Sequence, residues 1–235
     1  MKTHPVVSRD EWLTARKDFL AKEKEFTRLR DQLSQQRRDL PWVRVDKDYV
    51  FDGPHGKESL SDLFEGRHQL IVYHFMFHPS WEDGCKSCSF WADNYRGIIV
   101  HLKHRDVTLV TVSKAPLAKL DSFKQRMAWD FKWVSSFGND FNRDYHVSFT
   151  PEDMDRGEVD YNYRLTTFPV EEAPGISVFF KDQEQRIFHT YSCYARGLDM
   201  LNGAYHYLDL VPKGRDEAGL SSTMAWLRHH DNYDD

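Results

Sequence analysis

Two cysteines separated by two residues, Cys85 and Cys88, are the side chains in this sequence best suited to redox chemistry. If Cys85 lies in the first turn of a helix, residues three apart share one face, and the two sulfurs can approach bonding distance. The unpaired N–H groups at a helix N-terminus stabilise a thiolate and lower the pKa of the first cysteine. Cys85 is therefore the predicted nucleophile of thiol-disulfide exchange. Cys88 is the predicted resolving thiol, which releases a mixed disulfide by attacking Cys85.

Charged residues around the pair act on the thiol pKa in opposite directions. Lys86 would favour the thiolate, whereas Glu82 and Asp83 would oppose it, so the sequence leaves the redox potential open. His78 is expected near the end of the preceding strand, within reach of the thiol. Asp93 is expected about two turns down the helix. It would be either a buried proton acceptor for the second thiol or a solvated residue.

The pair could also serve purposes other than dithiol chemistry. A CxxC can form half of a zinc site, but a structural site needs four ligands and no second CxxC is present, so histidines would have to complete it. The pair can also pack without chemistry in a non-enzymatic adaptor. A thiol peroxidase is the remaining alternative, but peroxiredoxins share a Pro-x-x-x-Thr/Ser-x-x-Cys motif. Here His78 and Glu82 occupy its proline and hydroxyl positions, with Pro79 one place out of register. We favour the dithiol and expect neither a metal nor an organic cofactor.

Cys193 and His74 could also take part in chemistry, but their surroundings indicate structural roles. Cys193 could exchange with the pair, but an isolated cysteine is more often a small buried hydrophobe. His74 lies within an apolar run, where a hydrogen-bonded core histidine is the expected role. Neither residue is assigned to the predicted site.

The hydrophobic pattern of the sequence predicts the strands and helices that would position the cysteines. A nearly unbroken apolar run over 70–77 predicts a central strand covered on both faces, shortly before the pair. A helix over 89–104 and a second buried strand over 107–112 complete a βαβ unit. A helix is expected over 117–129 and an antiparallel hairpin over 175–191. These elements indicate an α/β fold with a central mixed sheet flanked by helices.

The N-terminal segment predicts a long amphipathic helix. Ser8 and Glu11 have the spacing of a capping box, and apolar residues then recur at helical intervals until Pro41. We expect this helix to cover a core or to make a contact in a homodimer. The following residues 42–51 alternate in polarity, which predicts a strand or hairpin arm.

The domain organisation is expected to be simple. Residues 1–41 form the N-terminal helix and 42–235 form the main domain, which together make one structural domain. An acidic, irregular surface loop is expected within about 150–173, a final helix over about 198–208, and a frayed tail from Asp231.

Composition narrows the class of protein. The 235 residues carry a net charge of -5 with acidic and basic residues mixed throughout, so nucleic acid is not an expected partner. The sequence contains no apolar run long enough for a membrane span and no signal-peptide core near its start. Three cysteines, two of them in a closely spaced pair, do not form the spread framework of a secreted disulfide scaffold. We expect a soluble cytoplasmic protein.

Several motifs together resemble a bacterial thioredoxin-like family of unknown function. These motifs are Asp52-Gly53-Pro54-x-Gly56, Ser59-Leu60-x-Asp62-Leu63-Phe64, Tyr73-His74-Phe75-Met76-Phe77, Gly84-Cys85-x-x-Cys88-Ser89-Phe90 and Tyr194-Ala195-Arg196-Gly197. Members of that family are described as predicted dithiol-disulfide oxidoreductases. The resemblance covers nearly the whole chain and implies a thioredoxin-like fold, with protein or small-molecule disulfides and thiols as substrates.

The resemblance also implies positions for two supporting residues. Thioredoxin-like proteins commonly carry a cis-proline facing the dithiol, just before the strand that follows the active-site half, and Pro174 is the matching candidate. The tryptophan that typically precedes the first cysteine is replaced by Gly84, with Trp81 nearby. Trp81 is therefore the aromatic residue expected at the site.

Overall fold

The computed structural model describes residues 4–233, which form two compact units, one ending at Pro41 and the other beginning at Trp42. The first unit consists mainly of α1 (Arg9–Arg38). Ser8 and Glu11 form the predicted capping box, because each side chain bonds to the backbone N–H of the other residue. None of the residues of α1 is buried. That it covers a core or joins two copies stays a prediction.

The second unit is built on an eight-stranded mixed sheet. Its order is β1-β10-β9-β4-β5-β6-β2-β3, with β4, β5 and β6 parallel and β9 antiparallel to β4. The sheet strands are β1 (Val43–Arg44), β2 (Val50–Gly53), β3 (Gly56–Ser59), β4 (Gln69–His74), β5 (Val107–Ser113), β6 (Trp133–Ser135), β9 (Gly175–Lys181) and β10 (Ile187–Tyr194). The parallel β4–β5 pair and the antiparallel β9–β10 hairpin confirm the predicted α/β mixed sheet of a thioredoxin-like fold. The short β6 was not anticipated.

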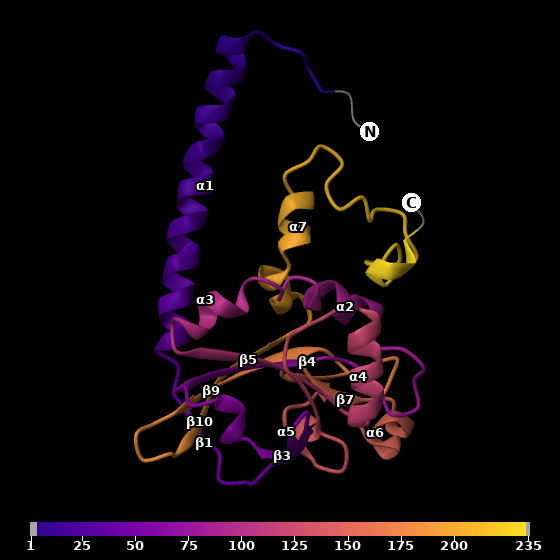
Figure 1. The fold of residues 1–235 in the computed structure, drawn as a ribbon. Helices are drawn as coiled ribbons and strands as arrows, with labels where there is room; N and C mark the ends of the chain where they lie inside the picture. Colours follow the sequence, from indigo (N-terminus) through magenta and orange to yellow (C-terminus); the bar gives the residue numbers. More distant parts are fainter. Residues whose placement is uncertain (1–3, 234–235) are drawn as a thin grey trace. The chain divides into compact units, whose positions relative to one another are not determined.

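Helices cover both faces of this sheet. The helices are α2 (Lys86–Ala92), α3 (Ile99–Lys103), α4 (Leu117–Arg126), α5 (Phe141–Asp144), α6 (Pro151–Arg156) and α7 (Gly203–Leu208), with 3₁₀ turns η1 (Asp62–Phe64), η2 (Ala195–Leu201) and η3 (His230–Asn232). In Figure 1, α2, α3 and α7 lie on one side of the sheet and α5 on the other. No helix within residues 4–233 combines the length and apolar character that crossing a membrane requires.

The alternation of side chains along β4 divides the core in two. Tyr73 and Phe75 point into the cluster that also holds Cys88, whereas Leu70 and Val72 point into the cluster on the opposite face. Successive residues of a strand face opposite sides, so a strand buried on both sides needs an apolar run without a break. This explains the unbroken apolar run of β4, the central strand that leads to the cysteine loop.

Two predicted helices are each divided in the structure. The helix expected over 89–104 becomes α2 and α3, since the chain leaves α2 at Asp93 and turns at Gly97, whose φ of +86° lies in the left-handed region. The helix expected over 198–208 becomes η2 and α7, and the Asn202 side chain caps α7 by accepting from the N–H of Tyr205.

The segment 150–173 is more regular than the predicted loop. Thr150 and Asp153 form a second capping box at α6, which ends at Gly157. A hairpin of β7 (Val159–Tyr161) and β8 (Arg164–Thr166) follows. Asn162 and Tyr163 both have positive φ at its turn, as a two-residue hairpin loop with right-handed strand twist requires.

Candidate functional site

Cys85 lies at the N-terminus of α2, after a loop that leaves the end of β4. Its backbone N–H donates to the carbonyl of Met76 at 3.0 Å, which fixes the start of the helix against the strand end. The residue before it must be small, because a Cβ on Gly84 would lie 2.7 Å from a Phe75 ring atom and 2.9 Å from a Phe123 ring atom. Gly84 therefore allows the loop to approach the core closely.

The surroundings of the Cys85 sulfur favour its thiolate. Hydrogen bonds from the Cys88 side chain, from the backbone of Cys88 and Ser87, and from the Ser87 side chain lower the pKa of Cys85 to about 7, although burial opposes this. The backbone donors belong to the first turn of α2, whose N–H groups have no partner within the helix. Lys86 is exposed on the helix and is not one of the donors that lower the Cys85 pKa.

Cys88 lies one turn further along α2 and is almost completely buried, with 1% of its surface exposed. Its sulfur accepts from the backbone N–H of Met76 at 3.4 Å and lies beside the Tyr73 hydroxyl. Burial raises the pKa of Cys88 well above its ordinary value, and the neighbouring Cys85 acts in the same direction. The pair is thus asymmetric, with an ionisable half-buried thiol in front of a buried neutral one.

The structure places the other predicted site residues in different surroundings. His78 contacts Ser80, with 2.7 Å between Nδ1 and Oγ, and burial lowers its pKa. Trp81 packs against the same apolar cluster as Cys85. Asp93 is exposed at the end of α2, where it accepts from Trp129 Nε1. It is therefore not the buried proton acceptor for Cys88 that one alternative proposed, because α2 ends before it could turn inward.

Pro174 lies at the predicted end of the sheet, and the structure decides its isomer, which the sequence left open. It precedes β9, whose Gly175 pairs with His74 at the end of β4, so the proline is at the edge from which the cysteine loop departs. The described chain contains no cis peptide bond, and Pro174 is trans. Its carbonyl accepts from the Tyr161 hydroxyl at 2.8 Å.

Sequence reasoning missed the C-terminal residues that hold the cysteine loop. His229 is buried, and its Nε2 lies 2.8 Å from the carbonyl oxygen of Gly84, the residue before the nucleophile. Arg126 bonds to Asp83 and to Asp231, both at 2.7 Å. The prediction of a frayed tail is therefore wrong up to residue 233, and residues 234–235 lie outside the described chain. No local pattern could have revealed contacts across such separations.

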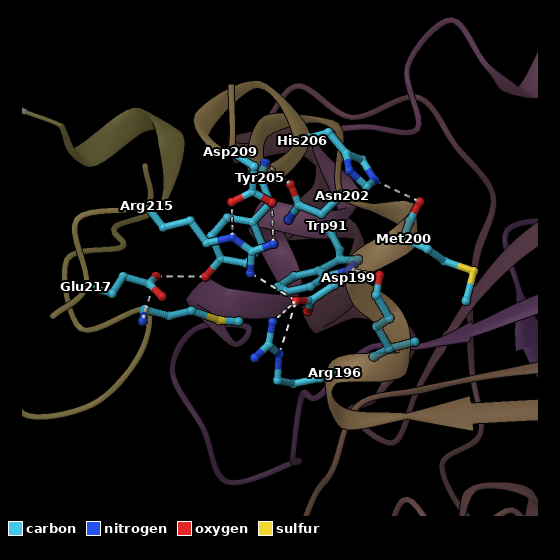
Figure 2. Close-up of polar contacts among 12 residues, drawn as sticks. Trp91, Arg196, Asp199, Met200, Asn202, Tyr205, His206, Asp209, Arg215 and Glu217 are labelled. Carbon is cyan, nitrogen blue, oxygen red and sulfur yellow. Dashed lines mark hydrogen bonds and ion pairs between the residues drawn. The ribbon is translucent and has the colours of Figure 1, made fainter. Parts of the chain in front are cut away.

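A polar cluster anchors the segment that packs on α2. Figure 2 shows Arg215 between Asp199 and Asp209, with nitrogen to oxygen distances of 2.9 Å to each. Its guanidinium carbon also lies 3.8 Å from the centre of the Tyr205 ring. The Tyr205 ring in turn contacts Trp91 of α2 edge-on at 5.9 Å. The C-terminal extension therefore supports the helix that carries both cysteines.

His74 and Cys193 have the core positions that the sequence predicted. His74 Nε2 lies 2.9 Å from Ser177 Oγ, and burial lowers the His74 pKa to about 3, so the ring is neutral. Cys193 is buried in the same apolar cluster as Cys88, and its sulfur contacts the carbonyl of Gly197 at 3.7 Å. Within residues 4–233, no three His, Cys, Asp or Glu side chains are grouped so that they could hold a metal ion.

Comparison with known proteins identifies a family but not a reaction. The model of a family described as "Bacterial protein of unknown function (DUF899)" matches residues 1–233. No curated protein sequence matches the chain.

Several solved structures are similar at low identity. They include peroxidoxin BcpB from Mycobacterium tuberculosis, at 12% identity and a TM-score of 0.41 over 69% of this chain and 93% of that one. Peroxiredoxin Q from Xanthomonas campestris has 12% identity and a TM-score of 0.41 over 66% and 88%. A putative thiol:disulfide interchange protein DsbE from Chlorobium tepidum has 12% identity and a TM-score of 0.40 over 69% and 95%. A functional assignment therefore has to come from this chain's own residues.

Proposed function

We propose that this chain, which belongs to the DUF899 family of bacterial proteins of unknown function, is a dithiol-disulfide oxidoreductase. The observation that carries the proposal is the asymmetry of the pair. Cys85 has a pKa of about 7 and is half-buried, whereas Cys88 lies one turn away, fully buried, with a raised pKa. A nucleophilic thiol with a pKa near the ambient pH is close to the optimum for thiol-disulfide exchange.

The reaction proceeds in two exchange steps. The Cys85 thiolate attacks one sulfur of a substrate disulfide, forming a mixed disulfide and releasing the other substrate sulfur as a thiolate. Cys88 then attacks Cys85, so that the Cys85–Cys88 disulfide forms and the second substrate sulfur leaves, taking the proton of Cys88. Two electrons pass from the dithiol to the substrate, and a second thiol donor reverses the sequence to restore the enzyme.

The proposed substrates are disulfides and thiols of proteins or small molecules, and the chemistry requires no metal or organic cofactor. Trp81 packs against the same apolar cluster as Cys85, and we propose that it contacts such a substrate. A peroxidase remains the second candidate, but no observation at the site favours it, because exposed Glu82 stands where peroxiredoxins carry a hydroxyl. A cytoplasmic location, where a reduced dithiol would be maintained, belongs to the same proposal.

A redox titration tests the proposal directly. The wild-type protein, Cys85→Ser and Cys88→Ser are equilibrated in glutathione buffers of graded potential, and the Cys85–Cys88 disulfide is quantified by mass spectrometry. We expect one reversible two-electron transition in the wild type and none in either variant. Insulin reduction should require both cysteines, whereas consumption of hydrogen peroxide with a Cys85-only dependence would instead support a peroxidase. A wild-type pair that never oxidises would reject the dithiol function.

A further inference from the structure

Two tyrosine hydroxyls near Cys88 are buried without a satisfied hydrogen bond. The side chains of Tyr73 and Tyr95 are 0% and 4% exposed, and neither hydroxyl oxygen has a hydrogen-bond partner of good geometry. Their rings meet edge-on at 5.6 Å in the cluster that contains Cys88. Burying an unpaired hydroxyl is unfavourable, so most such groups in proteins are paired, and an exception calls for an explanation.

The Tyr73 hydroxyl lies beside the resolving sulfur. It makes no hydrogen bond in the resting pair, but its proximity to Cys88 favours the thiolate of Cys88 and so opposes the effect of burial. The backbone N–H of Met76 approaches the same sulfur at 3.4 Å. A neutral thiol is a weak acceptor, whereas a thiolate carries a full charge and accepts strongly. These two donors would therefore stabilise the Cys88 thiolate and offset part of the burial that otherwise keeps this thiol neutral.

We propose that Tyr73 is a catalytic residue of the resolving step, donating its hydroxyl hydrogen bond to the Cys88 thiolate as that sulfur attacks the mixed disulfide. The inference rests on the proposed dithiol function. It explains how a sulfur that is fully buried can still be ionised long enough to react. Tyr73 does not accept the proton, because burial raises its own pKa and keeps it a phenol throughout.

The step balances without any further reagent. The S–H bond of Cys88 breaks, a bond forms between the sulfurs of Cys88 and Cys85, and the bond from Cys85 to the substrate sulfur breaks. The proton of Cys88 passes through solvent to the departing substrate thiolate. Tyr73 begins and ends the step with its own proton, and its contribution is limited to stabilising the intermediate charge on Cys88.

Stopped-flow reaction with the chromogenic disulfide dithionitrobenzoate separates the two steps. The first equivalent of thionitrobenzoate reports the attack by Cys85, and the second reports resolution by Cys88. Tyr73→Phe keeps the ring and removes only the hydroxyl. We expect an unchanged first phase and a second phase slowed roughly 10- to 100-fold, the rate equivalent of one hydrogen bond to a charged group. The Cys85→Ser protein gives the background from direct reaction of Cys88 and Cys193.

The matched control is Tyr205→Phe, which removes a hydroxyl from the same cluster that bonds to Glu217 and not to a cysteine. Both phases should be unchanged in this variant. Replacing Tyr73 by difluorotyrosine, a stronger donor of similar size, should accelerate the second phase and keeps the test available if Tyr73→Phe is poorly folded. An unchanged second phase, or equal slowing of both phases, would overturn the role of Tyr73. A wild type that shows no second phase would instead refute the dithiol function itself.

Discussion

The pKa of Cys85 depends most strongly on Cys88, and this dependence can be tested by a pair of substitutions. The hydrogen bond from the Cys88 side chain is the largest cause of the lowered Cys85 pKa, ahead of the backbone donors of Ser87 and Cys88. Cys88→Ala removes that donor, whereas Cys88→Ser replaces the thiol by a hydroxyl that can still donate. The two variants both abolish resolution, so they differ only in what they do to the nucleophile.

The expected size of the effect follows from the strength of one hydrogen bond to a charged group, about 1.5 to 3 kcal/mol. Since a pKa unit corresponds to about 1.4 kcal/mol, losing this donor should raise the Cys85 pKa by roughly one unit or more. At neutral pH the thiolate fraction would fall from about one half to about one tenth, and alkylation would slow roughly fivefold. Cys88→Ser should stay close to the wild-type value.

The assay is the rate of iodoacetamide alkylation at Cys85 as a function of pH, read by mass spectrometry of the peptide that contains it. The wild type should follow a titration centred at about pH 7. Because the thiolate is the reactive form, the rate rises with pH and levels off above the pKa. A wild-type midpoint near the ordinary value of 9.0, or equal midpoints in the alanine and serine variants, would refute the reasoning.

Three further predictions concern the scaffold around the pair. Gly84→Ala should lower the free energy of unfolding by about 1 to 3 kcal/mol in urea denaturation, because the new methyl group would overlap the Phe75 and Phe123 rings; an unchanged midpoint would show that the loop can move freely. His229→Leu should lower the melting temperature and slow alkylation of Cys85, because it removes the bond to the Gly84 carbonyl, while His229→Gln should recover part of both. Burial raises the pKa of Glu172 from 4.5 to about 8, so its contribution to stability is complete below pH 4.5 and is lost as the pH rises through 8. In Glu172→Gln, the free energy of unfolding should therefore fall less between pH 4.5 and 8 than it does in the wild type. If it falls equally in both proteins, Glu172 is not a buried neutral acid.

Local patterns in the sequence were sufficient for much of the fold. The capping box at Ser8, the apolar run of β4 and the β9–β10 hairpin all appear in the structure as the sequence predicts. These features depend on residues that are close in the chain, so backbone preference and hydrophobic period are enough to predict them. The breaks after Asp93 and at Asn202 were missed, because a helical period can continue through a point where packing ends the helix.

The sequence by itself determined which two sulfurs form the candidate site and which of them comes first at the helix start. Only the tertiary structure decided what surrounds them. Tyr73 reaches Cys88 because β4 packs beneath α2, and His229 reaches Gly84 across 145 positions of the chain. Asp93 instead forms hydrogen bonds with Trp129 and His230. Such contacts depend on how the elements pack in three dimensions, and the residues involved carry no local spacing that would reveal the pairing.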